Sequence, residues 1–128
     1  MKIVLALLFV CSLSPSFAKK IKVGLCVDNI ATDRWAIEIK SIENGIRAKG
    51  GVVFVKTALG STSHQEEQVR ELINTQNIDV LILVPVDKIK AASLVIEAQK
   101  DGVKVLLYSR NVEGAKADAF VSFNPFNI

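Results

Sequence analysis

The sequence predicts an α/β fold in which a doubly wound parallel sheet, of strand order 2-1-3-4-5, is covered by helices on both faces. Three observations lead to this prediction. Short apolar runs alternate with patterns of helical period, and runs such as residues 80–84 are continuously apolar, as in strands buried on both faces. The length of 128 residues suits one domain. Right-handed crossovers between successive parallel strands then favour this strand order.

The first half of the sheet is predicted from two apolar runs that flank one helix. Residues 21–27 form the first strand, and residues 52–55 form the second. Between them, residues 34–49 have the period of a helix whose apolar face consists of Trp35, Ile39, Ile42 and Ile46. Gly50 and Gly51 end this helix, because glycine readily adopts the backbone conformation found just beyond helix C-termini.

Two further helices alternate with the remaining strands. Ser63 and Glu66 have capping-box spacing, which predicts the start of a helix with the inward face Val69, Leu72, Ile73 and Gln76. Asp87 is the predicted N-cap of a helix over residues 88–101, with the inward face Ala91, Leu94, Val95 and Ala98. The remaining strands are predicted over residues 79–84, ended by Pro85, then 103–108 and 119–123.

The N-terminus has the pattern of an export signal over residues 1–18. Lys2 precedes eight apolar residues, and the segment ending at Ala18 has small residues at both positions of a cleavage site. We therefore expect cleavage after Ala18 and a periplasmic domain of residues 19–128. The alternatives to an export signal are a membrane anchor and a buried strand. The apolar stretch is short for a bilayer span, which argues against the anchor. Lipoprotein processing at Cys11 is disfavoured by the large residue before it.

Composition and motifs argue against several classes of function. The net charge of +3 comes from 16 basic and 13 acidic residues spread along the chain, which disfavours nucleic-acid binding. Neither a glycine-rich phosphate loop nor a G-x-S-x-G motif occurs, so no catalytic residue is assigned. The single histidine, His64, is expected to face solvent, and neither a metal site nor a cofactor is predicted. Cys26 lies within an apolar run, where a buried, unreactive thiol is expected.

Polar residues beyond the C-terminal ends of the strands are the candidates for ligand binding, because ligands bind at that edge of such sheets. Arg34 and Trp35 follow the first strand, and Arg110 follows the fourth. A guanidinium donates hydrogen bonds to hydroxyls, and an indole face packs on the apolar face of a sugar ring. From spacing alone, the simpler interpretation is that Trp35 begins the core face of its helix and both arginines are surface charges.

The sequence also resembles a known family, the periplasmic xylose-binding proteins of ABC sugar importers. The resemblance rests on residues 22–25 opening the first strand, residues 28–35 with the Arg-Trp pair, Pro85, residues 108–110, and residues 121–124. The Arg-Trp pair is typical of the xylose branch. The other features are shared with the wider ribose, xylose and galactose binding-protein family.

This resemblance implies a function without enzymatic activity. The family has two similar α/β lobes, binds a monosaccharide between them and presents it to the membrane permease of the importer. It implies that this chain corresponds to the first lobe, that the ligand is a pentose such as D-xylose, and that Arg34, Trp35 and Arg110 contact the sugar. Ser109 is a further candidate contact, at a position where the family residue does not carry over.

Two departures from the family pattern affect the expected affinity. The family has an Asp-Arg pair after the fourth strand, whereas this chain has Ser109 before Arg110. A neutral hydroxyl in place of a carboxylate costs on the order of 1.5–3 kcal/mol in binding. The chain also ends at Ile128, near the crossover to the second lobe, so we expect a truncated lobe with an open sheet edge. We therefore predict weak or undetectable sugar binding unless a separate polypeptide supplies the second lobe.

Two other functions are compatible with this pattern. A sensory or protein-interaction module could use a related lobe to contact a receptor, and co-purification with a receptor in place of a permease would identify it. A small flavodoxin-like enzyme or receiver domain is disfavoured by the missing phosphate loop and by the export signal.

Overall fold

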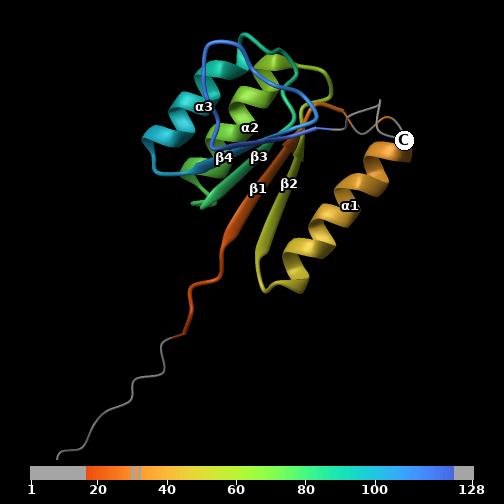
Figure 1. The fold of residues 1–128 in the computed structure, drawn as a ribbon, viewed down its shortest axis with the longest axis vertical. Coiled ribbons are helices and arrows are strands. Elements are labelled where there is room, and N and C mark those ends of the chain that lie inside the picture. Colours follow the sequence, from red (N-terminus) through yellow and green to blue (C-terminus); the bar gives the residue numbers. More distant parts are fainter. Residues whose placement is uncertain (1–16, 30, 32, 123–128) are drawn as a thin grey trace, which may run out of the picture.

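The computed structural model describes residues 17–29, 31 and 33–122 of the chain. Within these residues, strands and helices follow one another as the sequence predicts (Figure 1). The elements are β1 (Lys22–Val27), α1 (Asp33–Ala48), β2 (Val52–Thr57), α2 (Thr62–Asn74), β3 (Val80–Leu83), α3 (Ala91–Lys100), β4 (Lys104–Tyr108) and β5 (Ala119–Val121).

The strands form one parallel sheet in the order β2-β1-β3-β4-β5, which confirms the predicted fold class. Helix α1 lies on one face of the sheet, and α2 and α3 lie together on the other (Figure 1). Helices join β1 to β2, β2 to β3 and β3 to β4, whereas an irregular segment joins β4 to β5. Because all five strands are parallel, their C-terminal ends meet at one edge. The loops at that edge hold the candidate ligand-binding residues.

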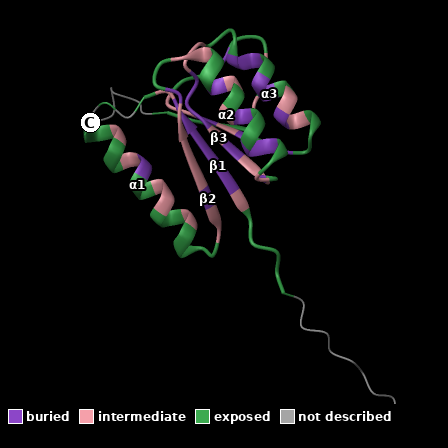
Figure 2. Cartoon of the chain, turned by 180° about the vertical axis from the view of Figure 1, so that it is seen from behind, coloured by how far each residue is buried: buried purple, intermediate pink, exposed green. Residues whose placement is uncertain are grey.

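Two apolar layers sandwich the sheet, and the layer beneath α2 and α3 is the larger. Because side chains alternate between the faces of a strand, Cys26 packs against α2 and α3, whereas its neighbours Leu25 and Val27 pack against α1. Figure 2 shows the same asymmetry, with buried positions along α2 and α3 and mostly exposed or half-buried positions along α1. In α1, Ile39 is the one fully buried residue among those described.

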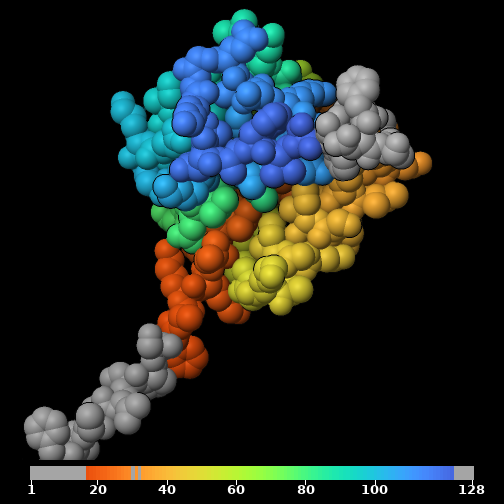
Figure 3. Space-filling view, viewed as in Figure 1, coloured from red at the N-terminus to blue at the C-terminus, as the bar shows by residue number. Residues whose placement is uncertain are grey.

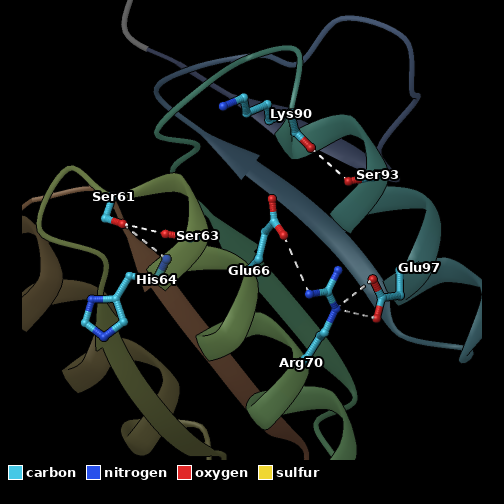
Figure 4. A network of polar contacts seen from close by, with 8 residues as sticks. All are labelled: Ser61, Ser63, His64, Glu66, Arg70, Lys90, Ser93 and Glu97. Carbon is cyan, nitrogen blue, oxygen red and sulfur yellow. Dashed lines mark hydrogen bonds and ion pairs between the residues drawn. The ribbon is translucent and has the colours of Figure 1, made fainter.

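The predicted capping box at the start of α2 is wrong. Ser61 is the N-cap: its backbone is extended, and its hydroxyl accepts a hydrogen bond from the His64 amide at 3.2 Å. Ser63 lies inside the first turn, 3.1 Å from the Ser61 hydroxyl (Figure 4). Two serines separated by one residue compete for the cap, and the one with an extended backbone can take it. His64 is exposed, as predicted.

The inward face of α2 also differs from the prediction at its two ends. Gln76 lies beyond the helix, which ends at Asn74, and the buried residue at the start of the helix is Gln65. On the outer surface, Arg70 lies between two carboxylates, 3.6 Å from Glu66 and 3.2 Å from Glu97 of α3 (Figure 4). The ion pair with Glu97 links the two helices that cover this face, and the pair with Glu66 lies within α2.

Helix α3 begins later than predicted, at Ala91. Asp87 still caps the preceding turn, because its Oδ1 accepts hydrogen bonds from the amides of Ile89 and Lys90 at 2.9 and 2.8 Å. These contacts hold the pKa of the Asp87 carboxyl below its usual value, with the Lys90 amide the largest cause. The predicted inward face of Ala91, Leu94, Val95 and Ala98 is buried, which confirms the helical period.

The last strand is short and exposed. Strand β5 covers residues 119–121, whereas the prediction extended to Phe123, which lies outside the described residues. Figure 3 shows the end of the described chain, in blue, on the surface of the molecule. Asp118 anchors the strand, since its Oδ2 accepts from the Val105 amide at 2.9 Å and from Gln99 at 3.2 Å. In the described part of the chain, no helix is long and apolar enough to cross a membrane.

Candidate functional site

A cavity of about 120 Å³ opens at the C-terminal edge of the sheet, between the loops after β1 and β4. It is lined by Asp28, Asn29, Ala31, Trp35 and Arg110. Two of the residues predicted from the sequence, Trp35 and Arg110, thus face one cavity although 75 positions separate them. The parallel topology explains this, because β1 and β4 both end at this edge.

Arg110 is held in place by two acceptors. Its Nη1 forms an ion pair with Asp28 Oδ2 and donates to the carbonyl oxygen of Pro85 at 3.1 Å. About half of the Arg110 side chain is exposed, compared with 18% of the Asp28 side chain. The guanidinium therefore bridges the ends of β1 and β3 and still reaches solvent. From the sequence, Asp28 belongs to the segment that carries the family resemblance but is not assigned to the site.

Arg110 also lines a second cavity, of about 580 Å³, which Trp35 does not line. Its other lining residues are Pro85, Val86, Lys88, Asn111, Val112 and Glu113. Lys88 and Glu113 form an ion pair there, and both side chains are largely exposed. Arg110 thus lines both a small cavity with an aromatic wall and a wider one with apolar and charged lining residues.

Trp35 is both a cavity wall and a core residue. Its indole packs against the apolar layer beneath α1 and meets the Tyr108 ring edge to face, with ring centroids 6.3 Å apart. The predicted packing of Trp35 at the start of the core face of its helix is therefore confirmed, and its contact with a sugar ring stays a prediction. The Tyr108 hydroxyl donates to Glu38 Oε2 at 3.0 Å. Burial, with this hydrogen bond second, raises the pKa of Tyr108.

Arg34 lies just outside the small cavity. Two thirds of its side chain is exposed, and its Nε donates to Glu38 Oε1 at 2.7 Å. The hydrogen bond to Glu38 raises the pKa of the guanidinium. The structure therefore brings Arg34 to the same helical turn as Trp35 without placing it among the residues that line the cavity.

Ser109 occupies a strained backbone position beside the cavity. Its φ of 67° lies in the left-handed region, which few residues other than glycine, asparagine and aspartate adopt readily. The Ser109 amide donates to the Val121 carbonyl at 2.7 Å, so β5 holds this turn. Ser109 is not among the lining residues of either cavity.

The residues that the structure describes contain no cluster of histidine, cysteine and carboxylate side chains that could hold a metal ion. Cys26 is fully buried, and burial raises the pKa of its thiol to about 12. The thiol is therefore protonated at neutral pH and is not a nucleophile. The edge of the sheet instead offers an aromatic face, guanidinium donors and the Asp28 carboxylate, which are the groups that recognise a polyhydroxylated ring.

Comparison with known proteins agrees with this chemistry. The chain is 36% identical over 111 residues to the D-xylose-binding periplasmic protein of Haemophilus influenzae, and 32% identical over 107 residues to that of Escherichia coli. The chain is a homologue of the D-xylose-binding periplasmic proteins. The matches cover 87% and 84% of this chain, which spans about a third of the length of these relatives, 33% and 32% respectively. No family model matches it.

Solved structures extend this homology to the fold. A solute-binding protein of an ABC transporter from Mycobacterium smegmatis, with bound glycerol, matches with a TM-score of 0.75 at 27% identity, over 80% of this chain and 35% of that one. A carbohydrate transporter solute-binding protein from Chloroflexus aurantiacus, in complex with D-glucose, matches with a TM-score of 0.73 at 28% identity, over 83% and 31%. This homologue of the xylose-binding proteins therefore has the fold of one lobe of a periplasmic binding protein.

Proposed function

We propose that the chain is part of the solute-binding component of an ABC-type sugar importer, that it acts in the periplasm and that its ligand is a pentose, D-xylose. Two relatives named as D-xylose-binding periplasmic proteins support the ligand and the location. We further propose that the partner of this chain is the membrane permease of the importer, to which the loaded binding protein delivers sugar. On this proposal the protein binds and releases its ligand unchanged and is not an enzyme.

One observation carries the proposal, namely that Trp35 and Arg110 line the same cavity. We propose that the Trp35 indole packs on the apolar face of the sugar ring and that Arg110 donates to its hydroxyls. Arg34, at the rim, supplies further donors, and Ser109 a neutral hydroxyl. Asp28 adds the carboxylate acceptor that the sequence pattern lacks at position 109.

The affinity expected of this chain is low. Good ligand sites have volumes of about 300–1,000 Å³ and bury most of the ligand surface, whereas this cavity has only about 120 Å³. The chain spans about a third of its relatives, so we expect the remaining contacts to come from a second lobe, on a longer chain or a separate polypeptide. By itself, the chain should bind D-xylose more weakly than about 1 mM, or −4 kcal/mol.

The test uses Trp35, which is the single tryptophan of the sequence. D-xylose is added to the isotope-labelled chain while Trp35 fluorescence and the amide and indole resonances are recorded. We expect the changes at the proposed sugar contacts, which are Asp28, Arg34, Trp35, Ser109 and Arg110, and at their immediate neighbours. Sorbitol at equal concentration is the control, because an open-chain polyol lacks the apolar ring face.

Two matched arginine variants make the test specific. Arg34 and Arg47 both belong to α1, and each pairs with a glutamate four residues away. Arg34→Ala should reduce the initial slope of the xylose response about tenfold, the cost of one hydrogen bond from a charged group, whereas Arg47→Ala should leave it unchanged. Equal responses to xylose and sorbitol, or equal effects of the two variants, would overturn the proposal.

A further inference from the structure

Glu38 links Arg34, at the start of α1, to Tyr108, at the end of β4. Its Oε1 accepts a hydrogen bond from Arg34 Nε at 2.7 Å, and its Oε2 accepts one from the Tyr108 hydroxyl at 3.0 Å. Tyr108 ends β4 and is 70 positions away in the sequence. One carboxylate thus joins the first turns of α1 to the strand that leads to Arg110.

Tyr108 also contacts Trp35 directly. The two rings meet edge to face at an interplanar angle of 70°, a favourable geometry for aromatic pairs. Trp35 lines the small cavity, and Tyr108 does not. The tyrosine therefore supports the indole from outside the cavity, and its hydroxyl is fixed by Glu38.

The Glu38 carboxylate is more sheltered from water than a typical surface charge, so its ion pair and hydrogen bond are screened less. Its side chain is 18% exposed, against 66% for Arg34. Exposed ion pairs contribute little, because water screens the charges and long side chains lose freedom when they pair. A sheltered carboxylate that accepts from two donors loses less to screening and constrains both donors.

We propose that Glu38 and Tyr108 are positioning residues of the sugar site: together they hold the Trp35 indole and the Arg34 guanidinium in the orientation that binds the ring. This inference rests on the proposed function for the identity of the ligand. The ordering of Trp35 can be measured without any sugar, so the two proposals fail separately.

The experiment compares four variants of the full chain. Glu38→Ala removes both hydrogen bonds, and Tyr108→Phe removes the hydroxyl but keeps the ring against Trp35. Glu38→Gln keeps an acceptor oxygen and tests rescue. Glu43→Gln is the matched control, since Glu43 pairs with Arg47 at 3.4 Å farther along the same helix.

Two measurements are made under conditions where each variant is folded. Acrylamide quenching and the near-ultraviolet circular dichroism of Trp35 report how firmly the indole is held, because the sequence contains no other tryptophan. We expect Glu38→Ala to raise the quenching constant about twofold and Tyr108→Phe to raise it less, because the edge-to-face contact remains. Glu38→Gln should restore most of the wild-type value.

The second measurement is the response to D-xylose. Glu38→Ala should reduce the initial slope of the titration about tenfold, whereas Glu43→Gln should not change it. Unchanged quenching and dichroism in both Glu38→Ala and Tyr108→Phe would overturn the positioning role, even if the variants unfold more easily. A changed Trp35 signal in these variants supports it, and a wild-type chain that does not respond to xylose would overturn only the proposed function.

Discussion

Gln65 provides the sharpest prediction about what holds the candidate site together. It is 2% exposed, and its amide bridges two backbone groups at the turn after β3. Nε2 donates to the Val84 carbonyl at 3.0 Å, and Oε1 accepts from the Val86 amide at 3.0 Å. Between these two residues lies Pro85, whose carbonyl accepts from Arg110. A buried side chain of α2 therefore shapes the loop on which the arginine rests.

The cost of Gln65→Leu follows from these contacts. The substitution leaves one carbonyl and one amide without their partner, and each such group costs about 1–3 kcal/mol when buried. The leucine recovers about 1–2 kcal/mol through the transfer of an apolar side chain from water. We therefore expect the free energy of unfolding to fall by about 3 kcal/mol, which lowers the urea midpoint by about 2 M for a slope of about 1.5 kcal/mol/M.

The assay is urea unfolding followed by Trp35 fluorescence, with amide exchange of Val86 as a local probe. Gln76→Leu is the control, because the Gln76 side chain makes no hydrogen bond among the residues described and lies beyond the end of α2. We expect the Val86 amide to lose protection only in the Gln65 variant. A loss below about 1 kcal/mol, or an equal loss in both variants, would refute the reasoning.

Three further predictions concern the site and the stability of the chain. Ser109→Asp should steepen the xylose response about tenfold, because aspartate tolerates the left-handed backbone and adds a carboxylate acceptor; an equal gain from Ser109→Asn would contradict this. Cys26 should react with a thiol reagent only as fast as the chain unfolds, because its thiol is buried with a pKa of about 12; rapid native-state labelling would disprove it. The pKa of Asp118 is lowered from 3.8 to about 2, chiefly by the Val105 amide, so its stabilising effect is present above the ordinary value and is lost as the pH falls from about 4 to about 2. In Asp118→Asn, the free energy of unfolding should depend less on pH between about 4 and about 2. The same pH dependence in the variant and the wild type would contradict this prediction.

Much of the fold follows from local patterns. Continuously apolar runs predict the strands, and the helical period of α3 correctly predicts its inward residues, because burial on both faces of a sheet demands these patterns. The helix starts are less predictable. Ser61 and Ser63 have the same side chain, and Ser61 is the cap because its backbone is extended. Local sequence does not distinguish the backbone conformations of the two serines.

The candidate site likewise contains residues that the sequence predicts and residues that it does not. Trp35 and Arg110 were recognised because each follows a strand that ends at the binding edge, and the structure places both at one cavity. Glu38 and Asp28 were missed as site residues, since a carboxylate on a helix or after a strand has the pattern of a solvated charge. The spacing of four residues between Arg34 and Glu38 was the one local signal available.

The sequence alone determined the strand order and the buried face of α3, because these depend on short-range periodicity and on the right-handed connection between parallel strands. It also predicts the edge at which a ligand would bind. Only the tertiary structure decided which side chains meet at that edge. The contact between Trp35 and Tyr108 and the ion pair between Asp28 and Arg110 join residues more than 70 positions apart. Such contacts depend on the register and twist of strands, which no local pattern specifies.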